Sequence, residues 1–354
     1  MNQPVLTVND LNVYFHTRQS YRLSQVLSNI SFKLYQGETL GIIGESGSGK
    51  SITLLSMLGL IGGNPGICSG EILLNNQHQS INLLQDIDQA VFIKQETNCP
   101  EINKNTGFWK KHIEPRFKKV RGNTLSMIFQ NPRLAFNPYI SIGKQISETI
   151  RLHTTIKNKK TAKEKAIEWL TAVKMDAPHI RYNNNPYGLS GGMCQRALIA
   201  MALSSEARII LADEPTSGLD ATVQSEILDL LQELKVKYQK SMLIVSHDLG
   251  VMQKISDRLL VYYQGHIVET ASTQDILHRP EKLHPYTQIL LNAHKATGFI
   301  EESKIQIQNV IVSGCPFHTH CQFVHELNNK CLKEKPDLKE ISPGHYIACW
   351  KYQA

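Results

Sequence analysis

One stretch near the start of the chain constrains its fold more than any other. Residues 44–51 read GESGSGKS and fit the pattern G-x-x-x-x-G-K-[ST]. The apolar run Leu40–Ile43 precedes them, and residues 52–60 can continue as a helix. This strand–loop–helix context is what the pattern requires, and it favours a nucleotide-binding loop over an ordinary glycine-rich turn. Glycines let backbone N–H groups surround phosphate oxygens, and a helix N-terminus adds partial positive charge.

We call residues 44–51 the phosphate loop. Within it, the ammonium of Lys50 is expected to reach the β- and γ-phosphates of a nucleotide, and the hydroxyl of Ser51 is expected to bind Mg²⁺. The expected nucleotide contacts in this loop are Gly44, Glu45, Ser46, Gly47, Ser48, Gly49, Lys50 and Ser51.

The composition is that of a large globular protein. The 354 residues suffice for an extensive core and two domains, and 41% of them are hydrophobic. No apolar run approaches the roughly 20 residues that span a bilayer, and residues 1–10 lack the pattern of a secretory signal. We therefore expect a cytosolic protein that reaches a membrane only through a partner. The net charge of +7 is mild for this length and favours solvated surface charge over a nucleic-acid-binding stripe.

Apolar patterns along the chain predict an α/β protein. The runs at 208–213, 241–246 and 258–263 are apolar without alternation, as in parallel strands that are buried on both faces. An amphipathic helix is expected between two of them, at 221–238. This alternation of strands and helices favours a mostly parallel sheet. From 84 to 117 no sustained period remains, which predicts an irregular surface insertion.

Two carboxylates follow one of these buried strands. Ile209–Asp213 is an apolar run that ends in Asp213, and Glu214 comes next. In an enzyme with a phosphate loop, the first carboxylate holds Mg²⁺ through its water shell, and the second is placed to polarise the attacking water. A solvated turn is the alternative for an isolated Asp-Glu pair, but the phosphate loop upstream favours the catalytic interpretation.

A second glycine-bearing turn, Ser190-Gly191-Gly192, lies at the start of an expected helix that runs to residue 202. By the same physics it is another anion site. A nucleotide needs one cradle in its own chain. A second, distant cradle therefore indicates that the site is completed by another subunit.

Taken together, these motifs resemble those of the ATP-binding subunits of ABC transporters. They occur in the family's order over roughly residues 5–265. The family's other motifs match Phe15 (A-loop), Gln130 (Q-loop), Ser217–Asp220 (D-loop) and His247 (switch histidine). The resemblance implies a P-loop NTPase fold with an ABC nucleotide-binding domain at 1–268 and a cysteine-rich extension at 269–354. The domain would have a mixed, mostly parallel sheet, an antiparallel edge, a helical subdomain at about 132–205 and the insertion at about 84–117.

The resemblance also implies roles for individual residues. The turn Ser190-Gly191-Gly192 matches the family's signature motif, and we call it the signature turn. Two such subunits sandwich two ATP molecules, each between the phosphate loop of one subunit and the signature turn of the other. The catalytic residues would be Glu214, His247, Lys50 and Gln130. Mg²⁺ would be held by Ser51 and Gln130, with Asp213 in its water shell. Ser190, Gly191, Gly192 and Asp220 would act in trans, and Phe15 would stack on adenine unless it is a rim residue of the core.

Local features resemble the peptide/nickel importer branch of the family. They are the segments 128–132 (IFQNP), 221–224 (ATVQ) and 284–287 (HPYT) and a cysteine-rich C-terminal part. The branch more often has an acidic residue where Asn131 stands, and Cys194 is unusual in the signature. A redox-sensitive thiol and a small helix residue are the two interpretations of Cys194, and the second is favoured.

This branch implies the motor subunit of a membrane importer for dipeptides, oligopeptides or antimicrobial peptides, with nickel or another small solute as the alternative. It also implies partners: a second ATPase subunit that is related but distinct, two transmembrane permease subunits and an extracytoplasmic solute-binding protein. The subunit would lie at the cytoplasmic face of the inner membrane and bind no nucleic acid.

Two other classes of protein are disfavoured. Soluble ABC ATPases of the translation type carry two cassettes in one chain, and those of the repair type carry long coiled-coil or zinc insertions; neither feature is found. An iron–sulfur redox protein with a vestigial nucleotide site would not need every catalytic position, yet all are intact.

Four of the seven cysteines crowd the C-terminal end, with the spacing Cys315-x5-Cys321-x9-Cys331-x17-Cys349. In a reducing cytosol such a cluster indicates metal rather than disulfides. Four thiolates suit Zn²⁺ or a [4Fe–4S] cluster, although zinc ribbons show close cysteine pairs that are missing here. The family resemblance implies the [4Fe–4S] cluster, with Zn²⁺ and unliganded thiols as alternatives. The histidines that are expected at the surface or behind the ligands are His318, His320, His325 and His345.

Overall fold

The computed structural model describes residues 3–16, 23–61, 64–76, 79–94, 101–297, 314–327 and 329–353. They form two compact units, each built from segments that are distant in the sequence. The first unit comprises Met1–Tyr35, Thr39–Phe117 and Val245–Ala354, and the second comprises Gln36–Glu38 and Lys118–Ile244.

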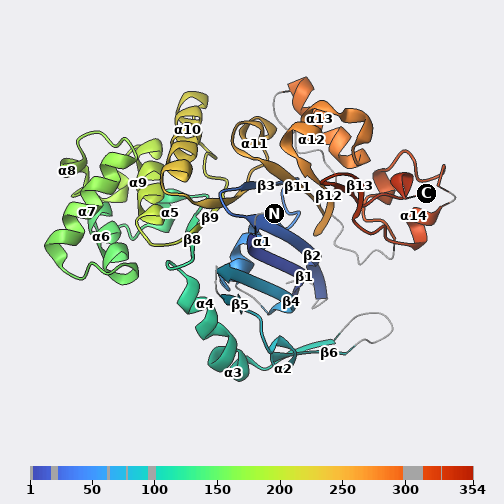
Figure 1. The fold of residues 1–354 in the computed structure, drawn as a ribbon, viewed down its shortest axis with the longest axis horizontal. Coiled ribbons are helices and arrows are strands. Elements are labelled where there is room, and N and C mark those ends of the chain that lie inside the picture. Colours follow the sequence, from blue (N-terminus) through green and yellow to red (C-terminus); the bar gives the residue numbers. More distant parts are fainter. Residues whose placement is uncertain are drawn as a thin grey trace. The chain divides into compact units, whose positions relative to one another are not determined.

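An antiparallel sheet forms one layer of the first unit (Figure 1). Its strand order is β2–β1–β4–β5. Leu6 and Val8 of β1 are fully buried, and they lie opposite apolar residues of both neighbouring strands. This sheet is the antiparallel edge expected from the sequence. Its strands are β1 (Pro4–His16), β2 (Leu23–Tyr35), β4 (Pro65–Asn76) and β5 (Gln79–Asn82).

The phosphate loop follows a strand of the other sheet in the first unit. There the strands run in the order β13–β14–β12–β11–β3. β3 and β11 are parallel, whereas the remaining neighbours are antiparallel. Every residue of β3 is buried, which explains why its sequence is apolar without alternation. The strands are β3 (Thr39–Gly44), β11 (Arg258–Tyr263), β12 (His266–Ser272), β13 (Lys339–Ser342) and β14 (His345–Ile347).

The helices of the first unit are short. From residue 270 onward these helices alternate with turns. The domain boundary that we expect at 268/269 lies within the strand β12. They are α1 (Lys50–Met57), α11 (Leu249–Ile255), α12 (Thr273–His278), α13 (Pro285–Thr297) and α14 (Lys330–Lys333).

The insertion at 84–117 is more ordered than its sequence predicts. Its described residues form a β-hairpin and a series of helical turns, so the expectation of an irregular segment is wrong. The strands have only four residues each, too few for a periodic pattern to be detected. The Arg116–Asp86 ion pair (2.9 Å) and the buried ring of Phe117 hold the insertion. Its elements are α2 (Ile87–Ala90), β6 (Val91–Lys94), β7 (Glu101–Lys104), α3 (Thr106–Phe108), a π-helical turn (Trp109–Ile113) and α4 (Glu114–Val120).

The second unit combines parallel strands with a group of helices. Its strand order is β10–β9–β8, and β8 and β9 are parallel. The helices α6, α7 and α9 contact one another (Figure 1). α6 and α7 each bury one apolar face, as at Ile146 and Ala166, whereas α9 is buried on nearly all sides. The strands are β8 (Leu125–Ile128), β9 (Ile209–Asp213) and β10 (Ser241–Val245). The helices are α5 (Pro132–Ala135), α6 (Ile142–His153), α7 (Lys159–Ala172), α8 (Pro178–Arg181), α9 (Gly191–Leu203) and α10 (Ala221–Lys237).

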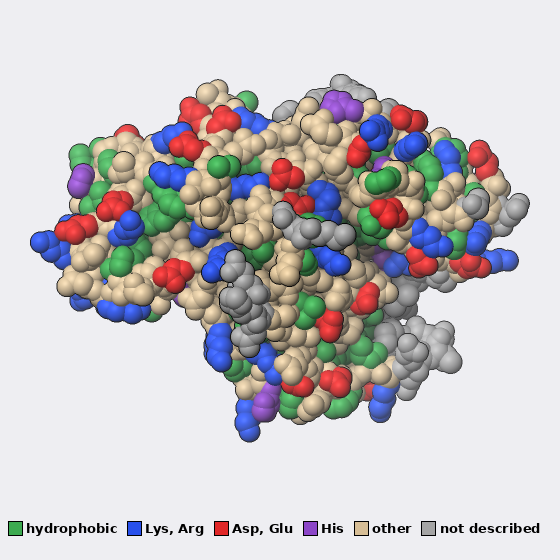
Figure 2. Space-filling model, viewed as in Figure 1, with side chains coloured by type: hydrophobic (Ala, Val, Ile, Leu, Met, Phe, Trp, Pro, Cys, Tyr) green, Lys and Arg blue, Asp and Glu red, His purple; other side chains and the backbone are tan. Residues whose placement is uncertain are grey.

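These elements confirm the α/β fold with its parallel strands and antiparallel edge. Among the described helices, none has the length and apolar character needed to cross a membrane. On the face that Figure 2 shows, Lys and Arg side chains are interspersed with Asp and Glu and form no continuous basic stripe.

Candidate nucleotide-binding site

Two glycines of the phosphate loop have backbone conformations that other residues would not adopt. Gly44 has φ +149°, and a Cβ atom there would lie 2.2 Å from the carbonyl oxygen of Tyr262. Gly49, the N-cap of α1, has φ +101°, and a Cβ atom there would lie 2.6 Å from the side chain of Leu27. The motif therefore needs glycine at both ends, for close backbone approach at one and for a left-handed turn at the other.

Lys50 is buried against the loop that precedes it. Its Nζ donates hydrogen bonds to the carbonyl oxygens of Gly44 (2.8 Å) and Glu45 (2.7 Å), and the residue is only 6% exposed. The ammonium is thus held by the loop backbone, where a phosphate cradled by the loop would meet it.

The loop is also fixed by neighbouring strands. The Gly265 N–H donates to the carbonyl oxygen of Ser48 at 3.0 Å. In the first turn of α1, the hydroxyl of Thr53 bonds to the carbonyl oxygen of Gly49 (3.1 Å) and to the hydroxyl of Tyr262 (3.3 Å). These contacts preorganise the backbone N–H groups, which reduces the ordering cost of binding a phosphate.

Two further predicted contacts belong to the first unit. Phe15 is half-buried on β1, where its Cα partners are Ser24 and Pro65. His247 is exposed in the turn between β10 and α11. Asp248 caps α11 by accepting from the Gly250 N–H at 2.7 Å. The structure therefore leaves the side chain of His247 accessible, and its role stays a prediction.

The second unit joins two motifs that are far apart in the sequence. The side-chain amide of Gln130 donates to a carboxylate oxygen of Glu214 at 2.9 Å. Glu214 follows β9 with φ +43°, and Asp213 is buried at the end of that strand. A left-handed conformation in a residue other than glycine costs of order 1–3 kcal/mol and is typical of functional sites. The turn aims the Glu214 carboxylate at Gln130 while its neighbour stays at the strand end.

The signature turn lies next to the start of α10, the helix that follows the D-loop, in the same unit. Ser190 is the N-cap of α9, and its hydroxyl accepts from the Met193 N–H at 3.3 Å. A Cβ atom at Gly192 would lie 2.8 Å from the side chain of Val223, in the first turn of α10. Asp220 caps that helix by accepting from the Val223 N–H at 3.0 Å. The N-terminus of α9 is exposed at Ser190 and Gly191, as an anion site requires.

The surroundings of Cys194 agree with the interpretation of this residue as a small helix residue and not as a redox-sensitive thiol. The side chain is fully buried, and burial raises its pKa to about 11. A buried, protonated thiol reacts slowly, because the thiolate is the reactive form.

The four C-terminal cysteines influence one another electrostatically. The pKa of Cys315 is raised to about 12, chiefly by burial and further by the thiols of Cys321, Cys331 and Cys349. Burial likewise raises the pKa of Cys349 to about 11. The Cys315 N–H donates to the carbonyl oxygen of Cys331 at 2.8 Å, which brings their backbones together.

Among the described residues, no group of three or more His, Cys, Asp or Glu side chains is placed so that it could hold a metal ion. His318 bonds to the carbonyl oxygen of Cys315 at 2.7 Å, and His325 is exposed. His345 was expected at the surface or behind metal ligands, but it is buried and bonds to Glu269 at 2.6 Å.

Comparison with known proteins identifies the family. The ABC transporter family model matches residues 27–217, and the model of the oligopeptide/dipeptide transporter C-terminal region matches residues 268–327. The chain belongs to the ABC transporter family. It is an ATPase of that family.

Relatives match this ABC ATPase over nearly all of its length. A probable peptide ABC transporter ATP-binding protein of Sinorhizobium fredii is 36% identical, over 98% of this chain and 95% of the relative. The oligopeptide transport ATP-binding protein AppD of Bacillus subtilis is 34% identical, over 99% and 97%. The solved ATP-binding cassette MJ0796, in a dimeric post-hydrolysis state bound to ADP and Pi, has a TM-score of 0.59 at 22% identity. The structural match covers 76% of this chain and 98% of the cassette, and it supports the fold assigned above.

Proposed function

We propose that this ABC ATPase is the motor subunit of a membrane importer that takes up di- or oligopeptides, antimicrobial peptides included. The observation that carries this proposal is the junction of two matches in one chain. The cassette match at 27–217, which contains the phosphate loop, is followed in the same chain by a C-terminal region of the oligopeptide/dipeptide transporter type at 268–327. Nickel or another small solute is the alternative cargo. We also propose the boundary at 268/269 between an ABC domain and its extension.

The geometry supports a division of labour within the ATP site. Lys50 would neutralise the β- and γ-phosphates, and the remaining loop residues would surround them with backbone N–H groups. Mg²⁺, held through Ser51, Gln130 and Asp213, would supply charge neutralisation between the phosphates. Glu214, oriented by Gln130, would accept a proton from the attacking water, and His247 would contact the γ-phosphate. Phe15 would stack on the adenine ring.

The exposed signature turn supports a site shared between two subunits. Ser190, Gly191, Gly192 and Asp220 would contact the ATP that is bound to a second subunit, which we propose to be a related but distinct chain. Two permease subunits and an extracytoplasmic solute-binding protein would complete the importer. The subunit would then lie at the cytoplasmic face of the inner membrane.

We also propose that residues 315–349, which contain the four C-terminal cysteines and which we call the cysteine segment, hold a [4Fe–4S] cluster. Each cysteine of such a cluster binds a different iron, so the thiols need not surround one point as they do for a single ion. The donor chemistry fits, because the four thiols are mutually close and backbone N–H groups point at three of them. The backbone N–H of Phe317 donates to the Cys315 thiol, that of Phe323 to the Cys321 thiol, and that of Lys351 to the Cys349 thiol. Such N–H groups stabilise sulfur in its thiolate form.

Uptake experiments test the cargo. In cells whose own copy is replaced by Glu214→Gln, we expect uptake of labelled oligopeptides to fall to background while nickel uptake stays normal. Cells carrying the wild-type copy on the same vector are the control. Loss of nickel uptake with normal peptide uptake would instead establish the alternative cargo.

Anaerobic purification tests the cluster. The wild-type protein should show broad visible absorption and contain iron and sulfide, and Cys321→Ser should lose all three. Cys68→Ser is the control, since Cys68 lies on β4 outside the cysteine segment. A colourless protein that contains zinc would show that the cysteines bind Zn²⁺ instead of a [4Fe–4S] cluster. A protein without any metal would refute both the cluster and the zinc site.

A further inference from the structure

The phosphate loop is bonded to a residue of the C-terminal region. The Glu45 N–H, the first after Gly44, donates to the hydroxyl oxygen of Tyr286 at 3.0 Å. Tyr286 lies in the first turn of α13, 241 positions further along the chain. Its side chain is buried, and burial raises its pKa, so the hydroxyl stays neutral and available to this N–H.

The ring of Tyr286 is held by two other aromatic rings. Its centroid lies 4.7 Å from that of Tyr263, on β11, and 5.6 Å from that of Phe317. Tyr263 and Phe317 meet edge to face at 5.1 Å. All three side chains are only 1% exposed. Close-packed rings in this geometry cannot move independently, so the position of the Tyr286 hydroxyl is defined by packing.

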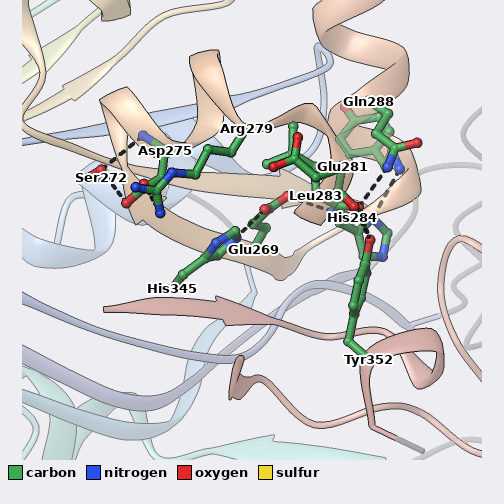
Figure 3. A network of polar contacts seen from close by, with 11 residues as sticks. Glu269, Ser272, Asp275, Arg279, Glu281, Leu283, His284, Gln288, His345 and Tyr352 are labelled. Carbon is green, nitrogen blue, oxygen red and sulfur yellow. Dashed lines mark hydrogen bonds and ion pairs between the residues drawn. The ribbon is translucent and has the colours of Figure 1, made fainter. Parts of the chain in front are cut away.

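The start of α13 is anchored by a buried polar network (Figure 3). The carboxylate of Glu269 accepts from the His284 N–H at 3.0 Å and bonds to the ring of His345 at 2.6 Å. The Tyr286 N–H in turn donates to Nδ1 of His284 at 3.1 Å. The backbone at the start of α13 is therefore fixed to β12 through Glu269, whose carboxylate also bonds to His345 of β14.

We propose that Tyr286 is a positioning residue of the ATP site, and that the C-terminal region thereby helps to build this site. Gly44 lacks a side chain to restrict the loop at its entry, and the Tyr286 hydroxyl supplies that restriction through the next N–H. A loop that is ordered beforehand binds a phosphate more tightly, because binding no longer carries the entropic cost of ordering it. The proposal rests on the ATP-binding role of the phosphate loop.

Nucleotide binding to the full-length Tyr286→Phe variant tests the proposal, because the ring remains and only the hydroxyl is lost. We expect the Kd for a fluorescent ATP analogue to rise about tenfold, the effect of losing roughly one buried hydrogen bond. The phosphate-loop peptide should exchange its amide hydrogens faster in the absence of nucleotide. The KM for ATP should rise with Kd, while kcat at saturating ATP is expected to stay within about twofold.

Tyr352→Phe is the matched control. Its hydroxyl donates to the carbonyl oxygen of Leu283 at 3.0 Å, so this variant loses a hydrogen bond near α13 without touching the loop. It should bind the analogue like the wild-type protein. Unchanged affinity in Tyr286→Phe, or an equal loss in both variants, would overturn the proposal.

Two further variants keep the outcomes distinguishable. If Lys50→Ala binds the analogue normally, the ATP-binding role of the loop is wrong, whatever Tyr286 does. If Tyr286→Phe does not fold, Phe317→Leu keeps the hydroxyl but loosens the ring. It should then raise Kd in a folded protein, and an unchanged Kd would refute the positioning role.

Discussion

At the scale of single residues, the site depends on backbone conformations that few side chains tolerate. Glu214 has φ +43° although it is not a glycine, and its carboxylate accepts a hydrogen bond from Gln130. The strain places a charged group at the end of a buried strand, where a regular conformation would continue the apolar run. This strained placement supports the catalytic role that we propose for the Glu214 carboxylate.

Replacing that carboxylate by an amide separates ATP binding from hydrolysis. Glu214→Gln can still accept the Gln130 hydrogen bond but cannot accept a proton from water. Phosphate release is expected to fall by at least ~10²-fold, while the Kd for ATP changes little. Asp229→Asn, on α10, is a control for the loss of one charge. Hydrolysis at the wild-type rate would remove Glu214 from the mechanism.

The entry to the phosphate loop has no room for a side chain. Gly44→Ala would place a Cβ atom 2.2 Å from a backbone carbonyl oxygen, so we expect the free energy of unfolding to fall by about 2–4 kcal/mol. Gly37 also has a positive φ (+74°) but has open space around it, so Gly37→Ala should lose only about 1 kcal/mol. Chemical denaturation measures both, and equal losses would show that crowding at Gly44 is unimportant.

At the scale of elements, the start of α13 depends on a neutral histidine. His284 is buried, accepts the Tyr286 N–H at Nδ1 and bonds to the backbone of Ala348. Burial lowers its pKa to about 3, below the ordinary value near 6.5. The folded protein therefore keeps this ring neutral at a pH at which the unfolded chain protonates it.

This difference predicts a loss of stability on acidification. Below about pH 6.5 the unfolded state binds a proton that the folded state does not, so His284 should remove about 2 kcal/mol of unfolding free energy between about pH 7 and pH 5. Above that range the histidine contributes no pH dependence. His284→Asn, which keeps an acceptor near Nδ1, should have a flatter profile in denaturation experiments. An unchanged slope would contradict the buried neutral ring.

At the scale of the whole molecule, the predicted ATP contacts are divided between the two units. The phosphate loop belongs to the first unit, whereas the signature turn and Glu214 belong to the second. The N-terminus of α9 is exposed at Ser190 and Gly191, which supports our proposal that the signature turn contributes to a site on a second subunit.

Association driven by ATP tests this arrangement. In the Glu214→Gln background, ATP should promote association with a second ATPase subunit, because the nucleotide is not hydrolysed. Ser190→Arg, added to that background, should abolish it by placing a bulky side chain at the signature turn. Tyr139→Phe, at a 90% exposed position, is the control. Sedimentation velocity with and without ATP measures the effect, and association in the Ser190→Arg protein would refute the shared site.

The sequence by itself determined the α/β fold, and it identified the phosphate loop, the signature turn and Glu214, the carboxylate for which we propose a catalytic role. These depend on residue type at fixed local spacing: glycines for left-handed turns, apolar runs for buried strands and caps for helix starts. The elements of the insertion were not predictable, because their strands are too short for a period and the contacts that hold them, such as Arg116–Asp86, are set by packing.

Only the tertiary structure decided how the distant segments cooperate. Nothing in the spacing of the HPYT segment indicates that Tyr286 bonds to Glu45, or that Glu269 joins His284 to His345. Such contacts arise where strands and loops from opposite ends of the chain meet in one core. Their partners are chosen by burial and hydrogen-bond geometry, which are properties of the folded protein and not of any local sequence pattern.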